Sequence, residues 1–233
     1  MLSKAVLFDL DGTLVDTPQA NVRLMTEVLA ESGRPMPEAD RVRATVGKAL
    51  EPSFAALLGV PLTDPLVSRQ ATRFRRLFRD RVLPEAGDLV FPEIPGLLRR
   101  LRTAGCALAV VTSKVRSSAE ELLAAAGLLE EFDAVVCHGM APRGKPQPDL
   151  ALLAARLLAL PPSACLVVGD AVDDVLMALA AGMPVVAVTY GVTSAAELLG
   201  AGATRLVGSA AELGELLDTH PSNLEQGRDR QWH

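Results

Sequence analysis

Residues 6–16 read VLFDLDGTLVD, and this stretch decides how the rest of the chain is interpreted. An apolar run over residues 5–8 ends on Asp9, and Asp11 follows just before a Gly-Thr turn. A short apolar run closed by a turn is typical of a buried parallel strand, and ligands bind beyond the carboxyl ends of such strands. Side chains alternate along extended backbone, so Asp9 and Asp11 are expected to face one crevice.

Three further polar motifs follow later apolar runs. They are VVTSK at residues 110–114, GKPQPD at residues 144–149 and VGDAVDD at residues 168–174. Taken singly, each motif has an ordinary structural explanation. A hydroxyl at a strand end often forms a turn, a lysine is often solvated, and an acid before a helix often caps it. Their common position after apolar runs favours a shared site.

Together these motifs resemble the signatures of the haloacid-dehalogenase-like hydrolase superfamily. The string DLDGTLVDT at residues 9–17 is similar to the first signature, and the other three follow in the family's order. The resemblance spans nearly the whole chain and leaves out only the C-terminal tail. It implies an α/β fold, with a doubly wound, Rossmann-like parallel sheet as the core and an inserted all-helical cap.

The sequence pattern predicts the same organisation. Residues 17–87 show helical periodicity without a convincing strand and resemble the family's cap, with hinges near residues 16–18 and 84–88. Residues 1–16 and 88–218 are assigned to the core, and residues 219–233 to a disordered tail. Within the core, predicted strands at 107–111, 134–137, 165–168, 185–188 and 205–207 alternate with predicted helices at 94–104, 117–126, 149–160, 172–181 and 195–199.

The resemblance implies a role for each catalytic candidate. Asp9 attacks phosphorus and becomes an aspartyl phosphate, while Asp11 protonates the leaving alkoxide and later takes a proton from water. Thr112 donates its hydroxyl to the phosphate. Lys145 pairs with Asp9 and the phosphate. Dehalogenase relatives lack an acid at the second position, so Asp11 favours phosphoryl transfer.

The resemblance also implies a magnesium ion. A carboxylate oxygen of Asp9, the backbone carbonyl of Asp11 and Asp170 would hold it, with Asp174 acting through water or an outer contact. Oxygen ligands suit this hard cation. Many relatives carry Ser where this chain has Ala171, so one hydroxyl donor is lost.

Substrate contacts are expected at the strand ends and in the cap. Backbone N–H groups around Ser113 would cradle phosphoryl oxygens. Lys48 lies where related caps present a specificity loop and would meet a substrate carboxylate or second phosphate, although simple surface exposure explains it equally well. The substrate-binding candidates are Gly12, Thr13, Ser113, Lys114, Arg43, Gly47 and Lys48. His138 receives no role.

Composition limits the function classes. A net charge of −5 argues against a general nucleic-acid binder. The arginines between residues 69 and 81 are expected to form a solvated helix face that could also attract anions. Cys106, Cys137 and Cys165 are expected to be free thiols in a reducing compartment. With no leader or membrane-length apolar run, a cytoplasmic protein that does not bind membranes is expected.

These inferences predict a magnesium-dependent phosphatase of the phosphoglycolate phosphatase-like subfamily. A sugar phosphomutase stays open as an alternative, although mutases tend to carry Glu-Asp where this chain has Gly169-Asp170. A non-catalytic module that binds a phospho-ligand is a second alternative. The ester is a small molecule whose identity the sequence does not name, and the protein is a monomer or a homodimer.

Overall fold

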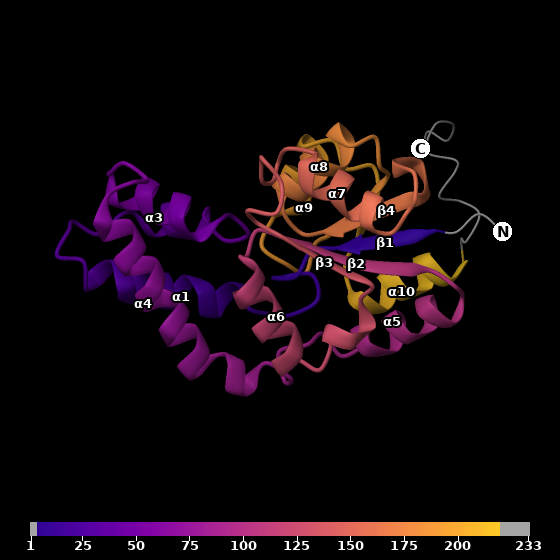
Figure 1. Ribbon diagram of the computed structural model, residues 1–233, viewed down its shortest axis with the longest axis horizontal. Helices are drawn as coiled ribbons and strands as arrows, with labels where there is room; N and C mark the ends of the chain where they lie inside the picture. Colours follow the sequence, from indigo (N-terminus) through magenta and orange to yellow (C-terminus); the bar gives the residue numbers. More distant parts are fainter. Residues whose placement is uncertain (1–3, 220–233) are drawn as a thin grey trace.

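The computed structural model describes residues 4–219 and contains one six-stranded sheet (Figure 1). All strand pairs are parallel, and the order across the sheet is β3-β2-β1-β4-β5-β6. The strands are β1 (Ala5–Phe8), β2 (Ala107–Thr112), β3 (Ala134–Cys137), β4 (Cys165–Gly169), β5 (Val185–Val188) and β6 (Leu206–Val207). Because β1 lies between β2 and β4, the chain reverses its direction of travel across the sheet there. Ligands of doubly wound sheets bind at such a switch point.

Helices cover both faces of the sheet, which confirms the predicted fold class (Figure 1). Along β1, Leu7 packs with one set of helices and Phe8 with the other, as strand alternation requires. The Leu7 face carries α7 (Asp149–Leu157), α8 (Val172–Ala180) and α9 (Ala195–Gly200); the Phe8 face carries α5 (Ile94–Thr103), α6 (Arg116–Ala125) and α10 (Ala210–Thr219). Short 3₁₀ turns at Leu129–Glu131 and Pro162–Ala164 precede β3 and β4.

Residues 18–85, called the helical region below, lie beyond the end of the sheet where β1 leads into α1 (Figure 1). The region contains no described strand. Its elements are α1 (Pro18–Ala30), α2 (Ala39–Arg43), α3 (Leu50–Leu58), α4 (Pro65–Arg81) and the 3₁₀ turn η1 (Leu83–Glu85). The Phe54 and Phe74 rings meet edge to face at 6.4 Å, so α3 and α4 share a small apolar core.

The two connections between the sheet and the helical region lie side by side. Val15 forms an antiparallel bridge with Val90, and the Asp16 N–H donates to the Leu89 carbonyl at 2.7 Å. These contacts lie close to the hinges expected from the sequence. They support the predicted division into a core and a cap over residues 17–87, which stays a prediction.

The arginines of α4 form more ion pairs than expected for side chains that are simply solvated. Arg81 forms a bidentate ion pair with Glu27 of α1, and Arg73 forms one with Glu31, the residue that follows α1. These guanidinium groups stay partly exposed, as predicted. These acids match part of the charge locally, and the steering of anions by the remaining charge stays a prediction.

Helix α10 was not predicted, and its sequence AAELGELLDT carries an internal glycine, which lowers helix propensity. Leu213 nevertheless packs fully buried against the Phe8 face. The predicted tail over residues 219–233 overlaps the last residue of α10 and otherwise lies outside the described residues.

Cys106, Cys137 and Cys165 are free thiols, as predicted. A search of the described helices finds none that is long and apolar enough to span a membrane.

Candidate active site

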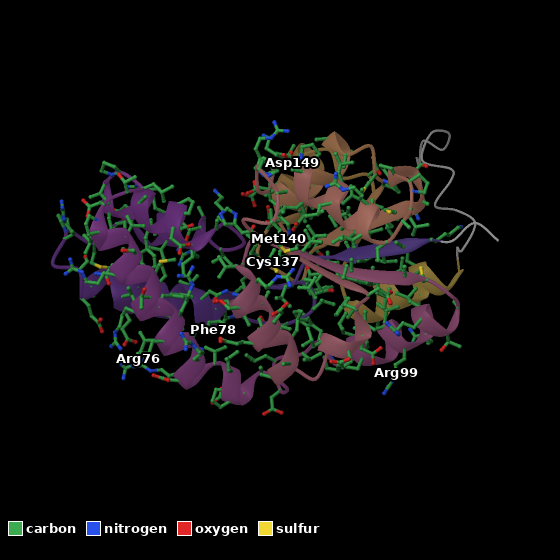
Figure 2. All side chains as sticks on the ribbon, in the orientation of Figure 1. Arg76, Phe78, Arg99, Cys137, Met140 and Asp149 are labelled. Carbon is green, nitrogen blue, oxygen red and sulfur yellow. The ribbon has the colours of Figure 1, made fainter. Side chains whose placement is uncertain are left out.

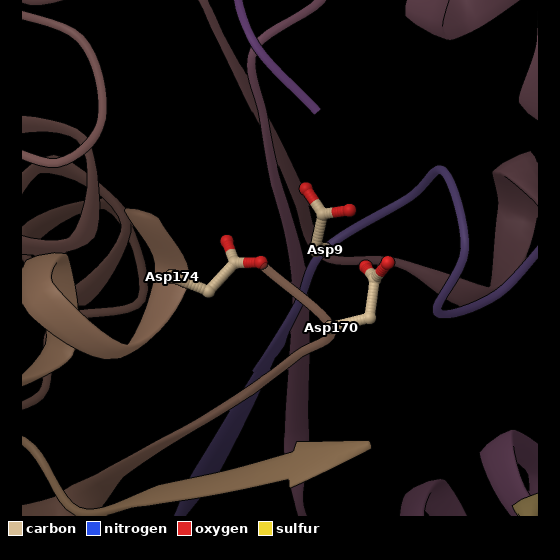
Figure 3. A group of neighbouring side chains, drawn as sticks. All are labelled: Asp9, Asp170 and Asp174. Carbon is tan, nitrogen blue, oxygen red and sulfur yellow. The ribbon is translucent and has the colours of Figure 1, made fainter. Parts of the chain in front are cut away.

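Three carboxylates converge at the switch point of the sheet (Figure 3). Asp9 follows β1 directly, Asp170 follows β4, and Asp174 lies in the first turn of α8. The Asp9 N–H donates to the Val168 carbonyl at 2.8 Å, which aligns the two strand ends. One oxygen from each carboxylate lies within 4.8 Å of the other two, so the group could hold a metal ion.

The Asp170 carboxylate is held by groups from two loops. The Thr13 hydroxyl donates to Oδ1 at 2.9 Å, and the Val192 N–H donates to Oδ2 at 2.8 Å. Gly12 has a φ of +86°, and a Cβ there would lie 2.4 Å from Asp170 Oδ2. The structure therefore places Gly12 and Thr13 against Asp170 and not in the cavity where contact with substrate was expected.

Lys145 joins two of the three carboxylates. Its Nζ lies 2.5 Å from Asp9 Oδ1 and 2.6 Å from Asp174 Oδ1, and only 2% of its side chain is exposed. Burial alone would lower the Lys145 pKa, but Asp174 and Asp9 outweigh that effect and raise it. The lysine is therefore a fixed positive charge beside Asp9.

The carboxylates carry more negative charge than Lys145 balances. Burial raises the pKa of Asp9 well above its usual range, with Lys145 opposing the shift and Asp174 adding to it. Burial and the neighbouring Asp174 raise the pKa of Asp170 to about 7. Three acids around one lysine leave an excess of two negative charges when all are ionised. A divalent cation with a preference for oxygen ligands fits that charge and that donor set.

Asp11 belongs to the same cavity but faces different partners. Its Oδ1 accepts from Lys114 Nζ at 3.0 Å, from Asn21 Nδ2 at 3.2 Å and from the Thr17 hydroxyl. Among the described residues, none donates to Oδ2. Cationic and neutral donors therefore occupy one carboxylate oxygen, while the other accepts no hydrogen bond from a described residue.

A cavity lies between the strand ends and the helical region. Its sheet side includes Asp9, Asp11, Thr112, Ser113 and Lys114, which are all predicted site residues. From the helical region, Gly47 and Lys48 also reach the cavity. Arg43 does not, because its Nη2 pairs with Asp40 Oδ1 at 2.5 Å on the exposed surface.

Several residues at the site were not predicted. Tyr190 donates its hydroxyl to the Thr13 carbonyl at 3.0 Å, and its ring packs edge to face on Phe91 at 4.6 Å. No local sequence pattern predicts the role of Tyr190, because it lies far from Thr13 in the sequence and the two residues meet only in the folded protein. Thr17 and Asn21 carry a readable signal, since Thr17 ends the first motif and Asn21 lies one helical turn after it.

Comparisons with known proteins identify the family. The model of the haloacid dehalogenase-like hydrolases matches residues 3–182. The chain is 39% identical to the probable phosphatase IndB of Dickeya dadantii, over 89% of this chain and 90% of that protein. It is 36% identical to a phosphoglycolate phosphatase of Caulobacter vibrioides, over 84% of each. The crystal structure of a predicted phosphatase from Clostridium acetobutylicum shares 28% identity with a TM-score of 0.79, covering 94% of this chain and 100% of that one. The chain belongs to the haloacid dehalogenase-like hydrolase family.

Proposed function

We propose that this protein is a magnesium-dependent phosphatase that hydrolyses a small-molecule phosphate monoester through an aspartyl phosphate on Asp9. One observation carries the proposal. Asp9 is held by Lys145 beside two further carboxylates, while Asp11 faces the same cavity with one oxygen free of described donors. A nucleophile and an acid-base group are thereby kept separate within reach of one substrate.

The residues that would hold Mg²⁺ are Asp9, the Asp11 carbonyl and Asp170, with Asp174 acting indirectly. Both oxygens of Asp174 already have partners: Oδ1 accepts from Lys145, and Oδ2 accepts from the Ala171 N–H at 3.1 Å. Of these two partners of Asp174, Lys145 is a cation that already balances its charge. When bound, the cation would neutralise charge on the phosphoryl oxygens.

Asp9 supplies the nucleophile in the first half of the reaction. Its carboxylate oxygen bonds to phosphorus as the ester P–O bond breaks. Lys145 favours the ionised nucleophile against the effect of burial. Asp11 gives the proton on its free oxygen to the departing alkoxide, so the alcohol leaves neutral.

Asp11 then reverses its role. As a carboxylate it takes a proton from water, the water oxygen attacks phosphorus, and the Asp9–phosphorus bond breaks to release inorganic phosphate. The donors on Asp11 Oδ1 keep the carboxylate oriented in both half-reactions. The second step regenerates both aspartates.

The end of β2 would bind the phosphoryl oxygens. Thr112 Oγ1 accepts from the Lys114 N–H at 3.2 Å, which leaves the hydroxyl proton to donate to the substrate. The neighbouring Ser113 and Lys114 also line the cavity, and the Ser113 N–H and the Lys114 ammonium would donate to the same oxygens. This arrangement places donors where negative charge develops.

A phosphate-release assay tests the proposal. Purified protein with p-nitrophenyl phosphate should release phosphate in Mg²⁺, lose that activity in EDTA, and lose it as the Asp9→Asn variant. Release that is equal in wild type and Asp9→Asn would contradict the proposal. With a sugar phosphate, free phosphate indicates a phosphatase, whereas an isomerised sugar phosphate indicates the mutase alternative.

A further inference from the structure

We infer that the alcohol part of the substrate carries an apolar group about the size of a phenyl ring, bound between α1, α3 and α4. The inference rests on the proposed function, because it concerns the leaving group of the same phosphate ester. It goes further by assigning the helical side of the cavity to one chemical class of alcohol. The lining and its charges carry the argument.

The leaving group must lie on the helical side of the cavity. Asp11, the residue that would protonate the leaving oxygen, bonds to Asn21 of α1 and to Lys114. Lys114 Nζ in turn lies 4.7 Å from the centre of the Phe78 ring of α4. Phe78, labelled in Figure 2, therefore connects α4 to the end of β2 through Lys114. An alcohol that accepts the Asp11 proton therefore extends toward these helices.

The wall that such an alcohol would meet is largely apolar. Phe74 and Phe78 stack at 6.2 Å with 26° between their planes, and both are more than nine-tenths buried. Aliphatic side chains from three helices complete this wall: Val22, Met25, Val42 and Leu50. Flat rings and branched aliphatic groups are complementary to an apolar ring on the ligand.

The cations around the cavity are mostly neutralised by partners in its own wall. Arg75 Nη2 lies 2.6 Å from Glu51 Oε1, and Lys114 pairs with Asp11. A second anionic group on the substrate would compete with these acids. Among the described residues that line the cavity, only Lys48 is a cation without a salt bridge, and it is exposed. The wall thus favours an uncharged apolar alcohol over an alcohol that carries a second anionic group, such as the glycolate of phosphoglycolate.

Matched alkyl esters test the inference. We would compare 3-phenylpropyl phosphate with n-propyl phosphate, because their alcohols leave with nearly equal ease, and include phosphoglycolate as the ester with an additional carboxylate. Burying a phenyl group is expected to raise kcat/KM about tenfold to a hundredfold, mainly through a lower KM. A kcat/KM for phosphoglycolate above that for 3-phenylpropyl phosphate would overturn the inference.

Two leucines of the helical region provide a matched pair of variants. Leu50 and Leu66 are both half-buried near the start of a helix, but only Leu50 lines the cavity. Leu50→Ala should reduce the preference for the phenyl ester about threefold to tenfold, whereas Leu66→Ala should leave it unchanged. Equal preference in both variants would contradict the assignment of this wall.

Binding of non-hydrolysable ligands separates the inference from the proposed function. Calorimetry with 3-phenylpropylphosphonate and n-propylphosphonate measures how much the phenyl group adds to affinity, without any turnover. Tighter binding of the phenyl ligand, weakened by Leu50→Ala, supports the site even if no ester is hydrolysed, and only the proposed function then fails. Equal binding of the two phosphonates overturns the inference whatever the enzyme hydrolyses.

Discussion

Lys145 and Asp9 lie 136 positions apart in the chain, yet Lys145 Nζ meets Asp9 Oδ1 at 2.5 Å. The contact links the loop after β3 to the end of β1, two strands that are not adjacent in the sheet. Burial of both groups makes the pair strongly interdependent, because either charge alone would be unfavourable there. The first prediction follows from this dependence.

Lys145→Met should lower kcat by about a hundredfold to a thousandfold, because the nucleophile loses the charge that keeps it ionised. The metal-free variant should also lose about 3 kcal/mol in the free energy of unfolding, since two buried carboxylates lose their cation. Steady-state kinetics and urea titration measure the two effects. Lys4→Met, just before β1, is the control. A kcat within tenfold of wild type would exclude the proposed role of Lys145.

Asp11→Asn should affect esters according to their leaving group. A propyl ester needs a proton on its alcohol, so its first turnover should slow by about a thousandfold. p-Nitrophenolate leaves without a proton, so its first turnover should slow much less. Rapid-quench measurement of one turnover isolates this half of the reaction. Equal slowing of both esters would show that Asp11 does not act as the acid.

Gly12→Ala should weaken magnesium binding about tenfold or more, because the new Cβ would displace Asp170. Gly59→Ala is the matched control. Gly59 also has a positive φ, of +66°, but a Cβ there meets no atom within 4 Å. Both variants should lose stability from backbone strain, while only Gly12→Ala should lose metal affinity in calorimetry. Equal metal affinity in the two variants would contradict the packing argument.

The stability of the metal-free protein should fall as pH rises from about 4 to about 7. Burial raises the pKa of Asp170 to about 7 in the folded state, above the ordinary value of 3.8 in the unfolded chain. Across this window the unfolded chain releases a proton that the folded protein keeps, so folding becomes less favourable by about 4 kcal/mol. Chemical denaturation in EDTA across the pH range measures this change.

Asp170→Asn should remove the part of this pH dependence that Asp170 contributes, and the raised pKa of Asp9 should leave a further part of the same sign. Added Mg²⁺ should raise the stability of wild type more at pH 7.5 than at pH 5, because the ion replaces the proton as the partner of the carboxylate. A wild-type stability that rises between pH 4 and 7 in EDTA would contradict the raised Asp170 pKa.

Much of this arrangement could be predicted from the sequence because its chemistry lies at strand ends. A parallel sheet brings the carboxyl ends of its strands to one edge, so apolar runs followed by Asp9, Thr112 and Asp170 indicate one site. The structure brings Asp9, Lys145, Asp170 and Thr112 to that edge. Their chemical roles stay predictions.

The remaining features depend on contacts that no local pattern encodes. The Val192 N–H donates to Asp170 and the Tyr190 hydroxyl donates to the Thr13 carbonyl, and neither residue type signals such a contact. Arg43 was assigned to the site by its position in a loop, but Asp40 lies one helical turn away and pairs with it. Side-chain direction within the helical region depends on packing between helices, and periodicity alone does not determine it.

The covalent state of Asp9 during turnover tests the central claim most directly. An acid quench within the first turnover, followed by peptide mass spectrometry, should find a phosphoryl group on the peptide that contains Asp9. The phosphoryl group should be absent in Asp9→Asn. Phosphate release at the wild-type rate with no phosphorylated peptide, or with the phosphoryl group on another residue, would contradict the mechanism.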